Sequence, residues 1–465
     1  MRIRALAALT LLAAAVAAVS AQTGPLQASL VVTNAIVVTM DAGARVLERG
    51  AVAVRGNTIV AVDGADAVAA AFTAKDRLDA GGQILMPGLV NTHTHAPMVL
   101  YRGLADDLAL MDWLQRYIFP AEARTVTREF VRAGTRLAAL EMIQSGTTTY
   151  ADMYYFEEEI ARVTRDAGLR GVLGQTIIRF PVPDAKTPQE ELARTRAFLE
   201  EFANDELITP AIAPHAMYTL DGDTLRAVRA MADTYGAPVL IHLAETADEL
   251  KTSQEEHRMS PTRYLESIGF WGPRTLAAHA VWLDAEDVGI LAKRKVAVSH
   301  NPESNMKLAS GTAKVPALRQ AGVDVGLGTD GAASNNDLDM FEAMRQAAFL
   351  HKLTTGDPRA VPAATALAMA TIEGARALQM DDRIGSLEPG KRADMIIVSM
   401  SGARQTPMYD PVSHLVYVAR GSDVTTTIVN GRILMRERTV LTLNEPDVIR
   451  EANELAKKVR QAVGK

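Results

Sequence analysis

His93 and His95 stand two residues apart at the end of an apolar segment, LMPGLVNTH, that is typical of a buried β-strand. Side chains alternate between the two faces of a strand, so both imidazoles point to the same side. Two imidazoles on one side can share a metal ion, although this spacing also occurs by chance on exposed strands. The pair therefore predicts a metal site only if further ligands follow elsewhere in the chain.

Further ligands of the right kind do end other apolar segments. His242 lies in PVLIHLAE and Asp330 ends DVGLGTD, which adds one imidazole and one carboxylate to the first pair. This donor set suits Zn²⁺ and also Fe²⁺, so the choice between these two metals stays open. A dinuclear centre would need a bridging ligand from the middle of the chain, but the segment there, ITPAIAPH, ends in His215. We therefore expect one divalent metal ion.

Two more residues stand where a hydrolase would need proton carriers. Glu245 follows His242 by three positions, so it lies on the loop just above the predicted metal and can reach a bound substrate. His279 ends the segment TLAAHAV, where it can accept a proton from the attacking water alongside Asp330. His300, in VSHNPESN, is explained equally well as a residue that organises a loop.

Apolar segments of strand length alternate with helical segments from Leu85 to about Val325. Eight such segments are LMPGLVNTH, GTTTYADM, GVLGQTII, ITPAIAPH, PVLIHLAE, TLAAHAV, VAVSHNP and DVGLGTD. Their nearly continuous apolar character is typical of parallel strands that are buried on both faces. The pattern predicts an α/β protein with a (β/α)8 TIM barrel over residues 86–385, whose site lies at the carboxyl ends of the strands.

The segments on either side of the predicted barrel have a different pattern. Residues 26–85 and 386–440 contain short β-rich runs such as AVAVRGNTIVAV and VTTTIVNGRILMRE, with Asn430-Gly431 as a hairpin turn. We expect them to form together one small β-sandwich domain. The last segment, 441–465, contains VIREANELAKKVRQAVGK, which predicts a solvent-facing amphipathic helix.

Composition excludes several classes of protein. The chain has 465 residues, of which 48% are hydrophobic and 22% charged, so it can bury a large core and is not disordered as a whole. Lys and Arg total 49 against 55 Asp and Glu, without a basic run, so nucleic acid is not an expected partner. The absence of cysteine excludes disulfides, thiolate metal sites and a cysteine nucleophile.

The first 21 residues have the pattern of a signal peptide. Arg2 and Arg4 precede an apolar stretch, and Ser20-Ala21 supplies small residues for cleavage after Ala21. A membrane anchor is the alternative, but the apolar stretch is shorter than the ~20 residues that cross a bilayer core. We expect an exported protein, periplasmic or extracellular, with no membrane attachment after cleavage.

Several motifs together resemble the amidohydrolase superfamily. They are HTHAPMVLYRG, PHAMYTL, HLAET, AAHAVWL, SHNPESNMKLASG and GTDGAASNNDLDMFEAMR. Within that superfamily they are similar to the 5'-methylthioadenosine/S-adenosylhomocysteine deaminases, and the similarity covers nearly the whole chain after the signal peptide. The resemblance implies that one metal ion is bound and that protons are moved at the positions already singled out. The metal ligands would be His93, His95, His242 and Asp330, and the proton carriers Glu245 and His279.

The resemblance also implies a nucleoside pocket. Glu122, in DWLQRYIFPAE, matches the family's ribose-binding glutamate and would accept hydrogen bonds from both ribose hydroxyls. Its alternative interpretation is an exposed glutamate at a helix start. His215 matches a residue that contacts the nucleoside, Trp113 would form part of the pocket wall, and Ser334 in GAASNN is a further candidate for substrate binding.

One position departs from the family pattern. The third strand of the family carries an arginine that binds the substrate tail, whereas this chain has Gln175 there. Arg179, four residues further on in the loop RFPVPDAKTP, is a candidate to replace that arginine. A neutral glutamine cannot reproduce the two charge-assisted hydrogen bonds that an arginine donates to a carboxylate.

Three functions follow from these residues. The first is hydrolytic deamination of adenosine-type nucleosides, with adenosine, 5'-methylthioadenosine and S-adenosylhomocysteine as substrates and an inosine analogue and ammonia as products. The second is hydrolysis of another C–N bond or electron-poor ring, such as guanine, a pterin, a triazine or a cyclic amide. The third is an exported binding protein on an inactive scaffold, which the complete set of ligands and proton carriers argues against. The partner is a small molecule in each case, and a homo-oligomer is left open.

Overall fold

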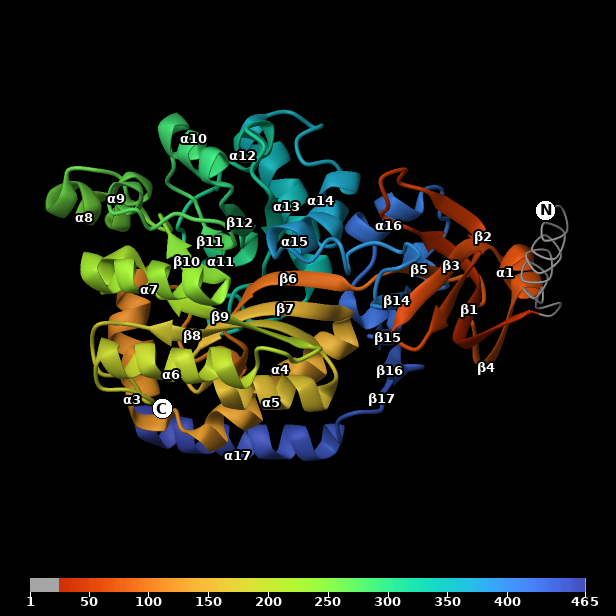
Figure 1. Cartoon of the computed structure of the whole chain (residues 1–465), viewed down its shortest axis with the longest axis horizontal. Coiled ribbons are helices and arrows are strands. Elements are labelled where there is room, and N and C mark those ends of the chain that lie inside the picture. The colour runs from red at the N-terminus through yellow and green to blue at the C-terminus, as the bar shows by residue number, and fades with distance from the viewer. Residues whose placement is uncertain (1–24, 465) are drawn as a thin grey trace, which may run out of the picture.

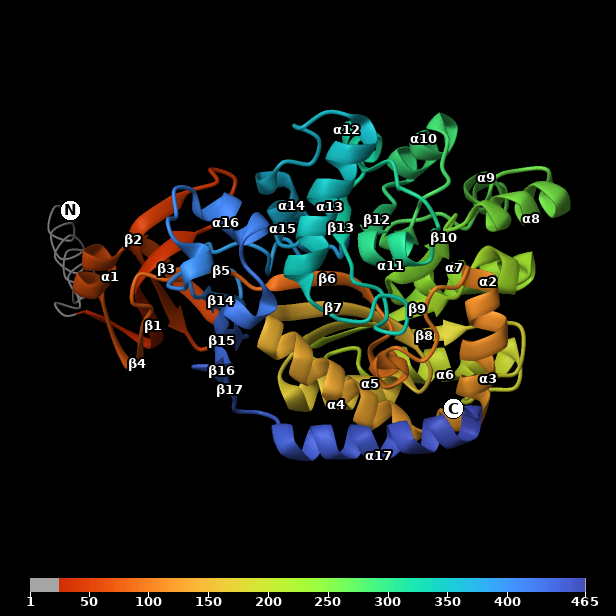
Figure 2. The same ribbon diagram turned by 180° about the vertical axis from the view of Figure 1, so that it is seen from behind.

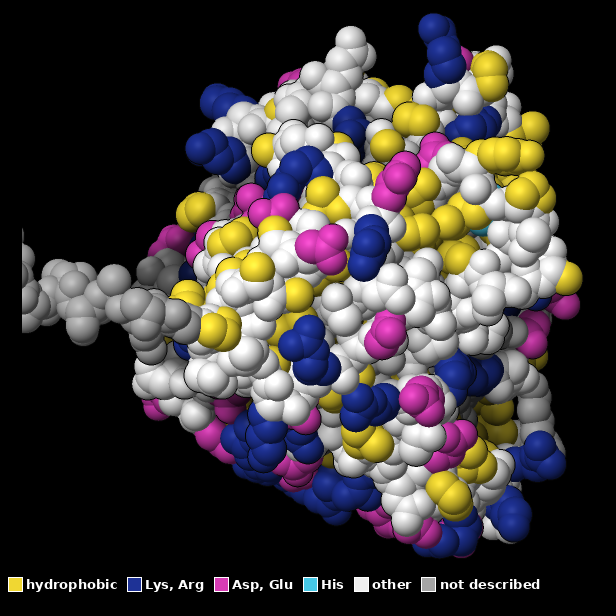
Figure 3. Space-filling model, turned by 90° about the vertical axis from the view of Figure 1, so that its right-hand side faces the viewer, with side chains coloured by type: hydrophobic (Ala, Val, Ile, Leu, Met, Phe, Trp, Pro, Cys, Tyr) yellow, Lys and Arg dark blue, Asp and Glu magenta, His cyan; other side chains and the backbone are white. Residues whose placement is uncertain are grey.

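The computed structural model describes residues 25–464, and in that range the chain forms two sheets (Figure 1). The predicted signal peptide, residues 1–21, lies outside the described residues and stays a prediction. No helix within residues 25–464 has both the length and the apolar character needed to cross a bilayer. On the face shown in Figure 3, Lys and Arg side chains lie among Asp and Glu side chains, and hydrophobic side chains gather at the upper right.

The larger sheet has eight parallel strands whose spatial order equals their order in the chain. The strands are β6 (Leu89–Thr94), β7 (Thr147–Tyr154), β8 (Arg170–Ile177), β9 (Ile208–Pro214), β10 (Val239–Leu243), β11 (Thr275–His279), β12 (Ala297–His300) and β13 (Val325–Leu327). The two ends of this sheet meet, because the Asp330 amide after β13 donates to the His93 carbonyl on β6 at 2.9 Å. The predicted α/β fold with an eight-stranded barrel is confirmed.

Helices follow the barrel strands and cover the outside of the barrel (Figure 1). They are α4 (Arg128–Ser145), α5 (Glu157–Ala167), α6 (Pro188–Glu201), α7 (Gly222–Tyr235), α8 (Ala247–His257), α9 (Pro261–Ser267), α10 (Ala285–Arg294), α11 (Pro302–Lys307), α12 (Val315–Gln320), α13 (Met340–Thr355), α14 (Ala363–Met369) and α15 (Ile372–Ala377). Their ends follow simple local signals. Thr127 caps the start of α4 by accepting a hydrogen bond from the Phe130 amide, and Gly146 ends that helix with φ of 88°, a conformation that glycine adopts without strain.

The smaller sheet has nine strands and joins the two ends of the chain. Its strands are β1 (Leu26–Val38), β2 (Val46–Arg55), β3 (Thr58–Gly64), β4 (Phe72–Asp79), β5 (Ile84–Pro87), β14 (Met395–Val398), β15 (Val424–Val429), β16 (Arg432–Arg436) and β17 (Thr439–Val440). Antiparallel pairing of β5 with β14 links the N-terminal part to the C-terminal part. Helices α1 (Ala65–Ala71) and α16 (Pro411–Tyr417) lie beside this sheet.

One apolar segment serves both sheets. LMPGLVNTH is a single predicted strand, but Ile84–Pro87 pairs with β14 in the smaller sheet and Leu89–Thr94 pairs with β7 in the barrel. The prediction of one strand was wrong here, because a continuous apolar run does not show where one strand ends and the next begins.

The C-terminal helix α17 (Glu445–Val463) lies along the barrel helices rather than free in solvent (Figure 2). Val448, Ala452, Leu455 and Val459 form its buried face. Arg136 on α4 donates to Glu451 on α17 at 2.9 Å. The helix is amphipathic as predicted, and its apolar face packs against the barrel.

Candidate metal centre and substrate pocket

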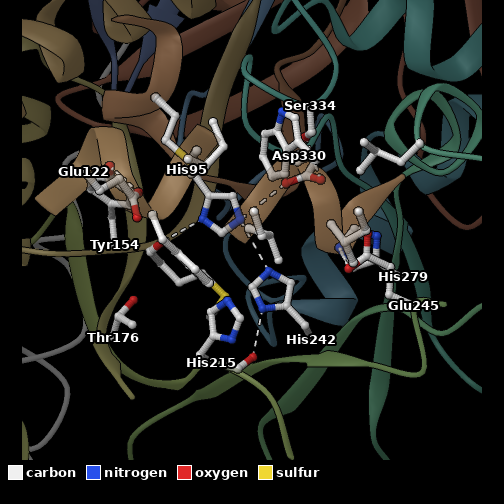
Figure 4. Close-up of a pocket in the computed structure, with 18 of the residues that line it drawn as sticks. His95, Glu122, Tyr154, Thr176, His215, His242, Glu245, His279, Asp330 and Ser334 are labelled. Atoms are coloured by element: carbon white, nitrogen blue, oxygen red, sulfur yellow. Dashed lines mark hydrogen bonds and ion pairs between the residues drawn. The ribbon is translucent and has the colours of Figure 1, made fainter. Parts of the chain in front are cut away.

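The polar residues that end the barrel strands meet at one pocket (Figure 4). Its lining includes His95 after β6, His215 after β9, His242 on β10, His279 on β11 and Asp330 after β13. Glu245, Glu122, Trp113 and Ser334 line the same pocket, and His93 lies directly behind it. The structure therefore brings together the residues that were singled out as ligands, proton carriers and substrate contacts.

The Nε2 atoms of His95 and His242 face each other without a proton on either. His95 Nδ1 lies 2.7 Å from the Met153 carbonyl, and His242 Nδ1 lies 2.8 Å from the His215 carbonyl. A carbonyl oxygen only accepts, so in each neutral ring the proton sits on Nδ1 and Nε2 keeps its lone pair. The two Nε2 atoms are nevertheless 3.3 Å apart. Two lone pairs at this distance repel each other, and a cation shared by both nitrogens removes that repulsion.

His93 and Asp330 complete the same cluster. Asp330 Oδ1 lies 3.4 Å from His93 Nε2 and 3.3 Å from His95 Nε2. His93 Nε2 is fully buried and has no hydrogen-bond partner among the described residues. The other carboxylate oxygen, Oδ2, accepts hydrogen bonds from Ser304 at 2.7 Å and Ser334 at 2.9 Å. These two hydroxyls hold the carboxylate so that Oδ1 faces the imidazoles.

The protonation states favour binding of a cation. Burial lowers the pKa of His93 to about 4, an effect that the neighbouring Asp330 carboxylate only partly opposes. Burial and the neighbouring histidines hold the pKa of His242 well below its ordinary value. Burial raises the pKa of Asp330, but the surrounding histidines outweigh that effect and leave the pKa well below its ordinary value. Neutral imidazoles and an ionised carboxylate fit a divalent metal ion.

Glu245 and His279 form a second pair at the edge of this cluster. Glu245 Oε2 lies 3.8 Å from His279 Nε2, and the pair is almost fully buried. His279 Nδ1 lies 2.9 Å from the Asn305 side-chain oxygen, so the proton sits on Nδ1 and Nε2 faces the pocket. Burial raises the pKa of Glu245, and the charge of His279 only partly offsets this. The buried environment therefore favours the protonated form of Glu245.

The backbone at two of these residues has an unusual conformation. His279 and Asp330 have φ of 71° and 66°, in the left-handed region that non-glycine residues rarely adopt. Such conformations cost free energy and are concentrated at functional sites, where the surrounding structure enforces them.

The opposite side of the pocket carries Glu122 (Figure 4). Glu122 lies on α3 (Phe119–Thr125), is 5% exposed, and accepts a hydrogen bond from the Tyr154 hydroxyl at 2.7 Å. Burial raises its pKa to about 7, although hydrogen bonds from Tyr154 and Tyr155 oppose that effect. Glu122 is therefore not an exposed residue at a helix start. Trp113 on α2 (Leu110–Trp113) forms part of the neighbouring wall.

His215 acts on the pocket in two ways. Its carbonyl accepts the Nδ1 proton of His242 and so orients that ring. Its own ring lines the pocket, with Nδ1 3.1 Å from the Thr219 hydroxyl. Burial lowers the pKa of His215 to about 3, so the ring meets a ligand in its neutral form.

Three residues from the sequence analysis lie away from the pocket. Gln175 turns towards Asp184, to which it donates a hydrogen bond at 2.9 Å, and it accepts one from the Glu157 amide. Arg179 is exposed and does not line the pocket. His300 Nε2 lies 3.1 Å from Nε2 of a second buried histidine, His351, outside the pocket lining.

Several residues of the site were not predicted, among them Tyr154, Tyr155, Ser304 and Asn305. Tyr154 ends β7 and Tyr155 follows it, so their position at the carboxyl end of a barrel strand could have indicated them. Ser304 and Asn305 lie on α11, where they contact Asp330 and His279. Both residues lie in the motif SHNPESNMKLASG, but their partners are more than twenty positions away in the chain, so the motif alone did not indicate these contacts.

Comparison with known proteins agrees with this geometry. Residues 84–434 match the amidohydrolase family. The chain is 46% identical over 437 residues to a 5-methylthioadenosine/S-adenosylhomocysteine deaminase of Syntrophobacter fumaroxidans, which covers 94% of this chain and 100% of that protein. It is 45% identical over 434 residues to a 5'-deoxyadenosine deaminase of Methanosarcina mazei, with 93% and 98% covered.

A solved structure extends the comparison to three dimensions. An adenosine deaminase from Xanthomonas campestris with bound zinc superposes with a TM-score of 0.92 at 40% identity, covering 94% of this chain and 100% of that one. The family match spans the barrel strands and the part of the smaller sheet between residues 84 and 434. The chain belongs to the amidohydrolase family.

Proposed function

We propose that the protein is a metal-dependent hydrolase that deaminates adenosine-type nucleosides. The observation that carries this proposal is the layout of one pocket, with four metal-ligand groups and the Glu245–His279 pair on one side and Glu122 on the other. The first side suits hydrolysis at an electron-poor carbon, and the second suits two neighbouring hydroxyls. The names of the relatives, which are deaminases of such nucleosides, support the same reaction.

One divalent ion, Zn²⁺ in our proposal, would be held by His93, His95, His242 and Asp330. When bound, such an ion lowers the pKa of water towards ~7 and so makes hydroxide available at neutral pH. The zinc bound to the related adenosine deaminase supports this choice of metal. The Nδ1 protons of His95 and His242, held by backbone carbonyls, keep both rings in the tautomer that a metal requires.

The proton carriers then have distinct tasks. Asp330 and His279 take the proton from the attacking water as its oxygen bonds to C6 of the purine ring. Glu245, whose burial favours the protonated form, delivers a proton to ring nitrogen N1. After a further proton transfer to the exocyclic nitrogen the C6–N bond breaks, ammonia leaves, and the 6-oxo product remains.

Glu122 would bind the sugar. An ionised carboxylate accepts two hydrogen bonds, which matches the 2' and 3' hydroxyls of a ribose. His215 and Trp113 would contact the base and the wall of the pocket. The hydroxyl of Ser334 is already used to hold Asp330, so we propose that Ser334 acts on the substrate through that carboxylate.

Ammonia release tests this proposal. The zinc-loaded protein would be assayed with adenosine, 5'-methylthioadenosine, guanine, a pterin and a triazine. We expect ammonia and an inosine-type change in absorbance from the adenosine compounds alone. Turnover of the other rings with none of the nucleosides would favour the alternative, an amidohydrolase for a different C–N bond.

Glu122 distinguishes these two functions in a second way. Under the nucleoside proposal, Glu122→Ala raises KM for adenosine and loses the preference for ribose over 2'-deoxyribose. An unchanged KM for the true substrate would mean that no ribose is bound there. Glu129→Ala, at an exposed position on α4, is the matched control.

We also propose that the protein is exported, on the sequence pattern of residues 1–21. Fractionation of cells that express the full chain, with N-terminal sequencing, tests this. Mature protein that begins after Ala21 is expected outside the cytoplasm. Uncleaved protein in the cytoplasm would contradict export.

A further inference from the structure

A second cavity adjoins the pocket on the side of Glu122. This side hollow has a volume of about 400 Å³. It is lined by Phe119, Glu122, Ala123, Tyr155, Phe180, Pro181, Val182 and Pro183. Three of these residues, Phe119, Glu122 and Tyr155, line the catalytic pocket as well. A nucleoside whose base lies beside Glu245 and whose ribose lies on Glu122 has the side hollow next to its sugar, because Glu122 lines both cavities.

The walls of the side hollow are apolar. The rings of Phe119 and Phe180 meet edge to face with their centroids 5.3 Å apart, and the chain from 181 to 183 closes one side with two prolines. Glu122 is the one ionisable carboxyl group in the lining. Within the described range, 25–464, neither the lining of the pocket nor that of the side hollow contains a lysine or an arginine.

Two basic side chains near this region bind other groups, and Arg179, which precedes Phe180, is exposed and lines neither cavity. Arg194 contacts Glu158 at 2.9 Å and Asp184 at 3.3 Å. Arg124 donates to the Ala462 carbonyl on α17 at 2.9 Å. The strand position that could carry a cation holds Gln175, whose amide donates to Asp184 and not into the cavity.

We propose that the side hollow receives the 5' substituent of the nucleoside and that it selects uncharged, apolar substituents over those that end in a carboxylate. This inference rests on the proposed function and adds a substrate class to it. Adenosine derivatives with a 5'-methyl or 5'-alkylthio group are the preferred class. The amino-acid tail of S-adenosylhomocysteine is disfavoured.

The physical reason is that a carboxylate in the side hollow would lose its hydration without gaining a charged hydrogen-bond donor. A carboxylate that enters an apolar cavity loses its hydration, and only a charged donor restores that free energy. The lining offers a second carboxyl group, Glu122, and no such donor. An alkylthio group instead exchanges water contact for contact with aromatic rings and prolines, which favours binding.

A substrate series on the zinc-loaded protein separates charge from length. The series is 5'-deoxyadenosine, 5'-methylthioadenosine, 5'-butylthioadenosine and S-adenosylhomocysteine. We expect kcat/KM for the butylthio compound to stay within about fivefold of the methylthio compound, and that for S-adenosylhomocysteine to fall by about tenfold or more, chiefly through KM. Equal or better use of S-adenosylhomocysteine would overturn the inference. An equally poor butylthio compound would also overturn it, since length and not charge would then decide.

A charge placed in the side hollow gives an independent test. Val182→Arg should raise kcat/KM for S-adenosylhomocysteine relative to 5'-methylthioadenosine by about tenfold, the effect of one charge-assisted hydrogen bond. Gln189→Arg adds the same charge at an exposed position on α6 and should leave the ratio unchanged. An unchanged ratio in folded Val182→Arg would mean that the tail lies elsewhere. If no adenosine compound releases ammonia, the proposed function itself fails. If the compounds are deaminated but kcat/KM does not depend on the charge of the 5' substituent, only the present inference fails.

Discussion

The Nε2 atoms of His95 and His242 face each other at 3.3 Å, and in the neutral rings neither carries a proton. Their Nδ1 atoms are held by the carbonyls of Met153 and His215, so the rings cannot turn to separate the two lone pairs without losing a hydrogen bond each. The fold thus keeps an unfavourable contact that a cation converts into a binding site.

Removal of the metal is expected to abolish activity and to lower thermal stability. A chelator should end ammonia release and lower Tm, because binding to the folded chain alone stabilises it. Zn²⁺ should restore both, with one ion per chain by metal analysis. His242→Ala should lose the ion, whereas His257→Ala on α8, away from the pocket, should keep it. Full activity of metal-free protein would contradict this prediction.

Glu245→Gln tests the proton carrier. Glutamine keeps the size of the side chain but cannot deliver a proton to the ring, so kcat should fall by ~100- to 10,000-fold. Metal content should stay at one ion, since Glu245 is not among the proposed ligands. Asp248→Asn, at an exposed position on α8, should have no effect on kcat. A Glu245→Gln enzyme with substantial turnover would exclude the proposed role.

Ser304→Ala tests how Asp330 is positioned. Without one of the two hydroxyls on Oδ2, the carboxylate is free to rotate away from the imidazoles. Loss of such a supporting hydrogen bond typically costs ~10- to 100-fold in metal affinity or activity. Ser334→Ala should act in the same direction, and Ser413→Ala on α16 is a control. Metal titration of each variant would measure the effect, and wild-type affinity in both alanine variants would contradict it.

Glu122→Gln should stabilise the protein at alkaline pH while it weakens substrate binding. The pKa of Glu122 is about 7 in the folded chain, above its ordinary value of 4.5, because the carboxyl is buried. As pH rises from about 5 past 7, the unfolded chain releases this proton first, so the group costs stability in that window. Below pH 4.5 both states keep the proton and the cost vanishes.

Urea unfolding at two pH values measures this effect. At pH 8 the free energy of unfolding of Glu122→Gln should exceed that of the wild type by about 1–3 kcal/mol, and at pH 4.5 the two should agree. The exposed variant Glu129→Gln should show no such difference. An equal or lower stability of Glu122→Gln at pH 8 would mean that the carboxyl does not ionise in a buried state.

Much of the fold could be read from local pattern. Eight apolar segments alternate with helices, and parallel strands that follow in chain order meet at one edge, so His93, His242 and Asp330 had to converge once the barrel closed. The motif and family resemblance agreed with this placement. The division of LMPGLVNTH between two sheets could not be predicted, since it depends on pairing of β5 with β14, more than 300 positions away.

By itself the sequence determined which groups can meet a metal and which can move protons, because residue type and strand period decide these. Only the tertiary structure decided how they are held. It directed Ser304 and Ser334 to Asp330, Tyr154 to Glu122, and Gln175 away from the pocket towards Asp184. Such hydrogen bonds depend on side-chain direction between elements distant in sequence, which periodicity does not encode.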